Sequence, residues 1–77
     1  MTAKDFHAAC SKNAVYKDTC VVKYKNTLYF PDHIIIRFNN LGKHENIGVV
    51  QTVLSRKEVE IPIRLLEFYT PNPNDAK

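Results

Sequence analysis

The side chains of this chain that could do chemistry are mainly basic. Lys23, Lys25 and Arg37 occupy odd positions in a stretch whose even positions are almost entirely apolar, and Tyr29 lies among them. Lysine and arginine contact phosphates and a tyrosine ring stacks on bases, so these residues predict a surface for single-stranded nucleic acid. The same lysines are equally typical of a strand that keeps one wet face for solubility.

Apolar side chains at other odd positions favour a different ligand. Val21 and Ile35 share the outward parity of Tyr29, which predicts an apolar patch with a basic rim, like a protein interface with aromatic and arginine anchors. The net charge of +3 is also modest for a nucleic-acid-binding domain of this size. The predicted binding residues are Lys23, Lys25, Tyr29, Ile35 and Arg37.

Two functions therefore compete. The sequence favours a small non-catalytic protein-interaction module, such as a regulator, an inhibitor or an accessory protein of a phage or mobile element. Its partner would be an unidentified protein or a second copy of the chain, bound by the strand face or by an open sheet edge. The alternative is a nucleic-acid-binding module that uses the basic strand face.

Catalytic and metal-binding groups are sparse. The three histidines stand in unrelated contexts, and Gly42 and Gly48 alone make neither a nucleophile elbow nor a phosphate-binding loop. We therefore expect no enzyme activity. His7 and Cys10 lie three residues apart, but structural zinc sites have paired ligands on both sides, and the other candidates are isolated. Those candidates are Cys20, His33 and His44. We expect no metal and no other cofactor.

Length and composition describe one small domain. A chain of 77 residues buries only roughly 60–65% of its unfolded surface, so its core is thin. No apolar run is long enough for a membrane span or a signal peptide, so we expect a cytoplasmic protein without membrane contact. In a reducing compartment Cys10 and Cys20 stay thiols, although they could form one disulfide.

A short helix is predicted over about residues 3–12. Thr2 can cap it, with Asp5 in the capping-box position. Its apolar side would consist of Ala3, Phe6, Ala9 and Cys10. Such a helix is marginal unless it docks, and its position decides the meaning of the outward patch. If the helix covers the odd face, the apparent binding patch is merely core.

Apolar side chains then fall almost entirely on even positions from residue 20 to residue 38. A period of two predicts strands with one buried face. A three-residue loop at 26–28 would preserve this parity by setting Tyr24 opposite Phe30. Pro31 interrupts the ladder, because proline cannot donate to it, and residues 33–38 resume it with the even face inward.

The remaining elements complete a mainly β fold, or α+β if the helix is counted. Residues 47–54 are apolar on both parities, so this strand is either covered on both sides or bent at Gly48. We expect a short N-terminal helix and a four- to five-stranded antiparallel sheet that curls into a small barrel, in one domain over residues 1–69. The predicted strands are 20–25, 29–38, 47–54, 58–63 and 67–69. Residues 70–77 are predicted to be a disordered tail.

The second half of the chain resembles small Src-homology-3-like barrels of the Tudor and KOW kind. The matching residues are Gly48-Val49-Val50-x-x-Val53, followed by Val59-Glu60-Ile61-Pro62-x-x-x-Leu66-Glu67. In those barrels a bent strand precedes a strand ending in proline, and a one-turn helix with a plugging leucine follows. The likeness covers about residues 47–69, and the first half departs from it because a helix precedes the sheet. It implies a binding module for nucleic acid or peptides, and fold analogy does not choose between them.

Overall fold

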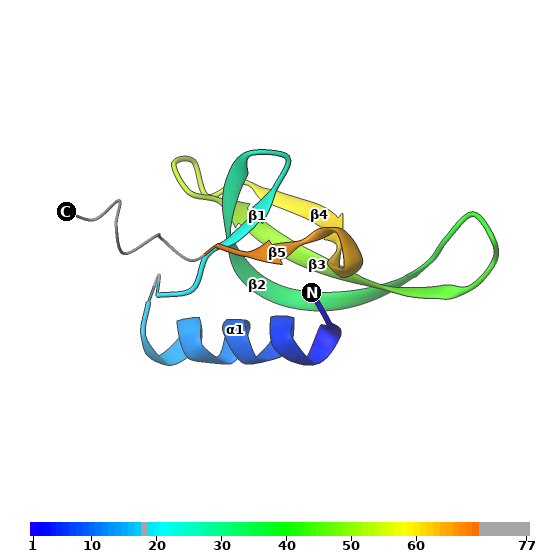
Figure 1. Ribbon diagram of the computed structural model, residues 1–77, viewed down its shortest axis with the longest axis horizontal. Coiled ribbons are helices and arrows are strands. Elements are labelled where there is room, and N and C mark those ends of the chain that lie inside the picture. The colour runs from blue at the N-terminus through cyan, green and yellow to red at the C-terminus, as the bar shows by residue number, and fades with distance from the viewer. Residues whose placement is uncertain (18, 70–77) are drawn as a thin grey trace.

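The computed structural model describes residues 1–17 and 19–69. A helix, α1 (Ala3–Val15), precedes a set of five strands (Figure 1). The strands are β1 (Val22–Tyr24), β2 (Thr27–Phe38), β3 (His44–Thr52), β4 (Glu58–Pro62) and β5 (Glu67–Phe68), with the one-turn 3-10 helix η1 (Ile63–Leu65) before the last. The tail predicted at 70–77 lies outside the described residues.

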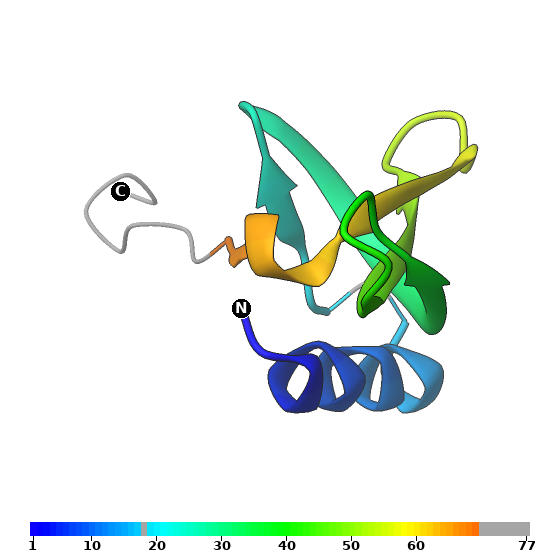
Figure 2. The same cartoon turned by 90° about the vertical axis from the view of Figure 1, so that its right-hand side faces the viewer.

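The strands form one antiparallel sheet in the order β4-β3-β2-β1-β5. The sheet is strongly curled, and α1 lies along one side of it (Figure 2). The edge strands β4 and β5 are not hydrogen-bonded to each other in this order, so the sheet stays open and does not close into a barrel. The expected helix followed by an antiparallel sheet is confirmed.

The helix docks on the core side of the sheet through Phe6. Its N-terminus is capped as expected, because the Thr2 hydroxyl accepts a hydrogen bond of 3.1 Å from the backbone N–H of Asp5. Phe6 is fully buried, and Ala3 and Cys10 pack beside it. The core cluster consists of Phe6, Val22, Val50, Ile61, Ile63 and Leu66.

The helix runs to Val15, beyond the end predicted at residue 12. Asn13 lies within this extra turn, and its side chain forms hydrogen bonds outside the helix. Its Oδ1 accepts a hydrogen bond of 2.7 Å from the N–H of Cys20, and its Nδ2 donates one of 3.0 Å to the carbonyl of Cys20. Asn13 thus ties the last turns of α1 to the segment that leads into β1.

The first hairpin differs from the predicted one. Tyr24 lies opposite Thr27, so the loop consists of Lys25 and Asn26 and not of the three residues 26–28. Both loop residues have positive φ, 46° and 63°, as the twist of a two-residue hairpin requires. Crossing this even loop reverses the parity, so Tyr29 packs against the core cluster and Phe30 takes the opposite side.

A β-bulge at Asp32 reverses the parity a second time. The register passes from Pro31 opposite Val50 directly to His33 opposite Val49, which leaves Asp32 without a partner. Ile34 therefore packs on the core side, as the even pattern predicted. The predicted parity is wrong between the turn and the bulge. Beyond the bulge the parity is as predicted, but Ile36 and Phe38, which were expected to be buried, are exposed.

Of the two alternatives predicted for strand β3, the structure agrees with a strand that is buried on both sides. Its residues Ile47 to Val50 are all buried. Gly48 leaves room for the ring of Phe6, which approaches its backbone closely. Strand β4 ends at Pro62, η1 follows, and Leu66 is buried in the core.

Candidate functional site

The outer face is the side of strands β2 to β4 that is turned away from the core. Alternation within the observed register defines its members. They are Phe30, His33, Ile35 and Arg37 in β2, Glu45, Ile47, Val49 and Gln51 in β3, and Glu58, Glu60 and Pro62 in β4. Since α1 inserts Phe6 into the core on the opposite side of the sheet, the outer face is not the surface against which Phe6 packs.

The predicted basic residues do not form one track on this face. Lys23 lies opposite Leu28, at the other end of β2 from Arg37, roughly 30 Å away along the strand. Lys23 is also opposite Glu67 of β5. Lys25 lies in the turn, with its ammonium 5.3 Å from the centre of the Tyr24 ring. Lys23 and Arg37 keep the outward parity, because the reversals at the turn and at the bulge cancel. The basic face is nevertheless not continuous, since Lys25 lies in the turn and the parity of part of the strand between Lys23 and Arg37 is reversed.

Two further predicted residues also change their environment. Tyr29, expected to stack on a ligand, packs against the core cluster. Ile35 does lie on the outer face, where it pairs with Ile47, and it is half-buried. Val21 is half-buried, and its carbonyl accepts a hydrogen bond of 3.0 Å from the N–H of Tyr69. Of the predicted patch, only Ile35 and Arg37 lie together.

Arg37 forms a two-pronged ion pair with Glu60. Its Nε donates to Oε1 at 2.6 Å and its Nη2 to Oε2 at 2.9 Å. The register places Glu60 opposite Val49 and Arg37 opposite Glu45, so the pair crosses β3 at Ile47. Hydrogen bonds from Arg37 lower the pKa of the Glu60 carboxyl below its usual value. The predicted phosphate ligand Arg37 is thus already paired with a carboxylate.

Three strongly exposed apolar side chains lie elsewhere, on the distal part of the β2–β3 hairpin. We call residues 36–46 the arm, because this segment extends beyond the N-terminal start of α1 (Figure 1). Ile36 and Phe38 are two residues apart in β2. They lie on the same side of the strand as Ile34, which packs against the core, and Leu41 lies at the tip of the hairpin. They are 64%, 70% and 81% exposed. These three side chains are the arm surface.

The arm is well ordered by its own hydrogen bonds. At the tip, Asn39 Oδ1 accepts hydrogen bonds from the N–H groups of Leu41, at 2.9 Å, and Lys43, at 3.1 Å. Gly42 adopts the positive φ of 75° that this turn needs. On the strands, the rings of Phe38 and His44 lie 4.4 Å apart. The arm therefore presents its apolar side chains from a defined backbone.

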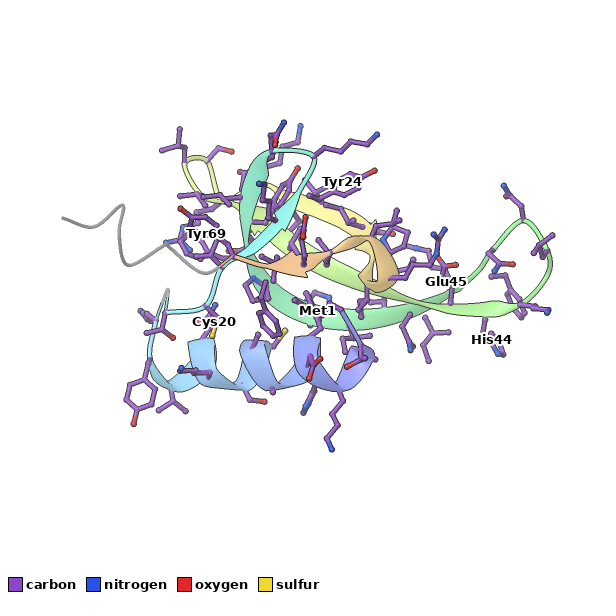
Figure 3. The ribbon with its side chains drawn as sticks, in the orientation of Figure 1. Met1, Cys20, Tyr24, His44, Glu45 and Tyr69 are labelled. Atoms are coloured by element: carbon purple, nitrogen blue, oxygen red, sulfur yellow. The ribbon has the colours of Figure 1, made fainter. Side chains whose placement is uncertain are left out.

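Ion pairs brace the opposite side of the arm. Figure 3 shows His44 and Glu45 pointing to opposite sides of β3. Glu45 faces Arg64 of η1, with 3.6 Å between Oε2 and Nε, while Arg37 holds Glu60. A hollow of about 270 Å³ lies between the root of the arm and the start of α1, and Met1 and His44 are among its lining residues. The strands that carry the arm surface are thus held on their other side by ion pairs, and a hollow lies next to them.

Sequence reasoning missed the arm surface because it assigned even positions to the core. The available signal was the partner strand. Ile36 and Phe38 face Asn46 and His44, both polar, so these apolar side chains have no apolar partner across the hairpin. The predicted strand began only at residue 47 and left this comparison out.

The metal ligands weighed in the sequence do not come together. Within residues 1–17 and 19–69, the structure brings three possible ligands to one point only once. They are Asp32, His33 and Glu58, whose ligand atoms all lie within 4.8 Å of one another. Only His33 was among the candidates considered from the sequence. The bulge that places Asp32 beside it follows Pro31, where the sequence predicted an interruption of the ladder.

Cys10 and Cys20 are both free thiols and half-buried. Burial, together with the negative charge of Asp32, raises the pKa of the Cys10 thiol from 9.0 to about 11. A thiol with a raised pKa is a poor nucleophile at neutral pH, because the reactive form is the thiolate. Cys10 therefore serves packing better than catalysis.

Comparison with known proteins returns no relatives. No family model matches the chain, and no curated protein or solved structure is significantly similar to it. Across the part of the chain that the structure describes, no helix has the length and apolar character to cross a membrane.

Proposed function

We propose that this chain is a small non-catalytic protein-interaction module that binds its partner through the arm surface. The observation that carries the proposal is the exposure of Ile36, Phe38 and Leu41, all above 60%, on one protruding hairpin. Scattered exposed apolar residues are ordinary, but large neighbouring ones on a protrusion are typical of binding surfaces.

The energetics support this assignment. Burying a side chain such as Ile or Phe releases about 1.5–3 kcal/mol relative to leaving it in water. The core of this chain does not extend to the arm, so the apolar side chains of the arm surface stay in contact with water. A partner with a matching apolar recess would recover it, and an aromatic anchor such as Phe38 is typical of interface hot spots.

The order within the arm also supports binding. The Asn39 hydrogen bonds and the ion pairs of Arg37 and Glu45 hold the hairpin before any partner arrives. A surface that is ordered in advance loses less conformational entropy on association. The arm would therefore meet its partner largely as a rigid body.

The charges give less support to nucleic acid as the ligand. Arg37 is paired with Glu60, and the carboxylates of Asp32 and Glu58 lie beside His33 of the outer face. A phosphate backbone would meet these carboxylates, which repel it. If nucleic acid is the ligand instead, the partners of the chain should be lost on nuclease treatment.

The order of the elements fits the proposed likeness to Src-homology-3-like modules. A strand that ends at Pro62, a one-turn helix and the buried Leu66 follow one another as that likeness implies. We infer a binding role from it and not a particular ligand. Two free thiols fit the proposed cytoplasmic location.

The test compares an arm variant with a matched variant elsewhere. Phe38→Ser removes the aromatic anchor of the arm, whereas Leu54→Ser removes a side chain that is 97% exposed on the β3–β4 turn. Both tagged variants and the wild-type chain are expressed in the source cell and isolated with and without nuclease. We expect a protein partner that survives nuclease and Leu54→Ser but is lost with Phe38→Ser.

Three results would overturn the proposal. They are loss of all partners on nuclease treatment, equal loss with both variants, and equal retention with both. Thermal unfolding of the purified variants provides the folding control. Because both residues are exposed, both variants should unfold close to the wild-type temperature.

A further inference from the structure

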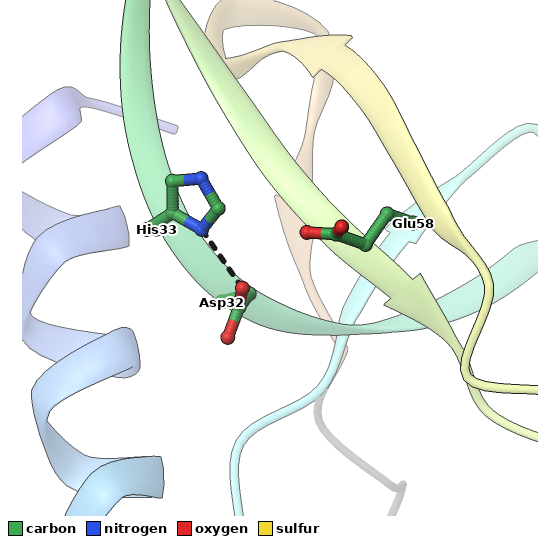
Figure 4. A group of neighbouring side chains, drawn as sticks. All are labelled: Asp32, His33 and Glu58. Atoms are coloured by element: carbon green, nitrogen blue, oxygen red, sulfur yellow. Dashed lines mark hydrogen bonds and ion pairs between the residues drawn. The ribbon is translucent and has the colours of Figure 1, made fainter.

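A second feature of the outer face is independent of the arm surface. The bulge in β2 leaves Asp32 unpaired between Pro31 and His33. In a regular strand, neighbouring side chains point to opposite faces, but a bulge redirects one of them. Asp32 and His33 consequently lie side by side, with His33 Nδ1 2.8 Å from Asp32 Oδ2 (Figure 4).

The third side chain reaches this pair from β4. Glu58 lies opposite Gln51, and Glu60 lies opposite Val49, so both carboxylates belong to the outer face. Glu60 is held by Arg37 at 2.6 Å and is turned to that partner. Glu58 instead extends over β3 toward His33, and its carboxylate completes the group within 4.8 Å (Figure 4).

The donor set selects a class of ligand. One imidazole nitrogen and two carboxylate oxygens suit borderline divalent ions such as Zn²⁺, which coordinates nitrogen and oxygen ligands at about 2.0–2.2 Å. Tetrahedral ligands at that distance lie roughly 3.3–3.6 Å apart. His33 Nδ1 and Asp32 Oδ2 are 2.8 Å apart and would have to separate slightly. The other ligand atoms lie within 4.8 Å of one another and would approach by at most roughly 1.5 Å. The side chains of His33 and Asp32 are 51% and 44% exposed, and Glu58 is exposed as well, so rotation of the side-chain ends can supply these adjustments.

We propose that Asp32, His33 and Glu58 form a surface site for a divalent transition-metal ion, with Zn²⁺ as the best match. Three protein ligands leave at least one coordination position for water or an added ligand. The ion would neutralise the two carboxylates, and it would cross-link β2 to β4 over the central strand. The site lies on the other face of the sheet from the arm surface, so it is separate from the proposed function.

The test adds Zn²⁺ to the full chain and follows it by titration calorimetry and by NMR of the histidine rings. We expect one ion per chain, with the largest shifts at the His33 ring. Glu58→Gln should weaken binding at least about tenfold, because it replaces a direct ligand. Zn²⁺ should also raise the unfolding temperature of the wild-type chain, and it should do so less for the variant.

Matched variants separate the site from adventitious binding. Glu60→Gln removes a carboxylate from the same face of the same strand and should leave Zn²⁺ affinity unchanged. His7→Ala and His44→Ala remove the other two histidines and should also bind normally. The proposal is overturned if millimolar Zn²⁺ does not bind, if the His33 ring does not shift, or if Glu58→Gln binds as tightly as the wild-type chain. Unfolding of the metal-free variants confirms that each is folded.

Discussion

The ring of Phe6 lies directly against the backbone of Gly48. A methyl group at Gly48 would stand 2.9 Å from Cζ of Phe6 and 3.1 Å from Cδ1 of Leu66. This contact joins α1 to the central strand and fixes the helix on the core side of the sheet. The outer face and the arm are therefore not the surfaces that Phe6 needs for its burial.

Gly48→Ala should destabilise the chain by about 1–3 kcal/mol, the usual cost of overpacking a core. Phe6 and Leu66 are both almost fully buried, so neither can move away freely. Denaturant unfolding followed by circular dichroism measures the loss.

The matched test is a double-mutant cycle with Phe6→Leu, which removes the crowded ring atoms. The double variant should lose less free energy of unfolding than the sum of the two single variants. Additive losses, or a Gly48→Ala variant as stable as the wild-type chain, would contradict the contact.

Asn13→Ala should destabilise the chain by about 1–3 kcal/mol, because it leaves the N–H and carbonyl of Cys20 without their partner. Asn40→Ala is the matched control, since Asn40 is exposed in the arm turn. The control should change the free energy of unfolding by less than about 0.5 kcal/mol. Equal effects of the two substitutions would mean that the hydrogen bonds between Asn13 and Cys20 contribute nothing to stability.

The alternation of apolar residues predicted the fold class but not the parity of every strand. Val22 and Ile34 both face the core as expected, yet Tyr29 and Phe30 between them are exchanged. The two-residue turn and the bulge each reverse parity, so their effects cancel beyond the bulge. Two reversals of parity restore the original alternation, so the period of two in the sequence does not reveal them.

The candidate surfaces were harder to predict than the fold, because each depends on a tertiary relation. Phe38 has the parity of a core residue, and only its polar partner His44 shows that the core has ended. Asp32 and Glu58 lie 26 residues apart in the sequence and meet only through the bulge and the register of β4. Arg37 was correctly placed outward, but its pairing with Glu60 required that same register.

Folded Cys10 should react slowly with iodoacetamide at pH 9, because burial and Asp32 raise its pKa to about 11. In a Cys20→Ser chain, which carries Cys10 alone, the rate should rise sharply when denaturant unfolds the protein. A rate at pH 9 that is the same for folded and unfolded chains would contradict this environment.

The same raised pKa makes stability depend on pH. The folded state keeps the Cys10 proton between about pH 9 and pH 11, where the unfolded chain has lost it. The unfolded state then binds fewer protons, so the Cys10 contribution to stability is present below pH 9 and is lost as pH rises to about 11. Cys10→Ser should remove this contribution to the decrease in the free energy of unfolding between about pH 9 and pH 11.

Glu60 should titrate below its ordinary value of 4.5, because the hydrogen bonds from Arg37 favour its charged form. Its contribution to stability is present above the unfolded pKa and is lost as pH falls through the lowered folded value. Carboxyl ¹³C NMR titration measures the pKa directly, and Arg37→Ala should bring it back toward the ordinary value. An unchanged pKa in that variant would contradict the ion pair.

The central claim is that the arm surface contacts a protein partner, and site-specific photo-crosslinking in the source cell tests it most directly. A benzophenone side chain is placed at position 38 in one chain and at position 54 in another. Both sites carry exposed apolar residues, and only the first lies on the arm. We predict a discrete nuclease-resistant protein adduct from position 38 and none from position 54. Equal adducts from both positions, a nuclease-sensitive adduct, or no adduct from position 38 would contradict the claim.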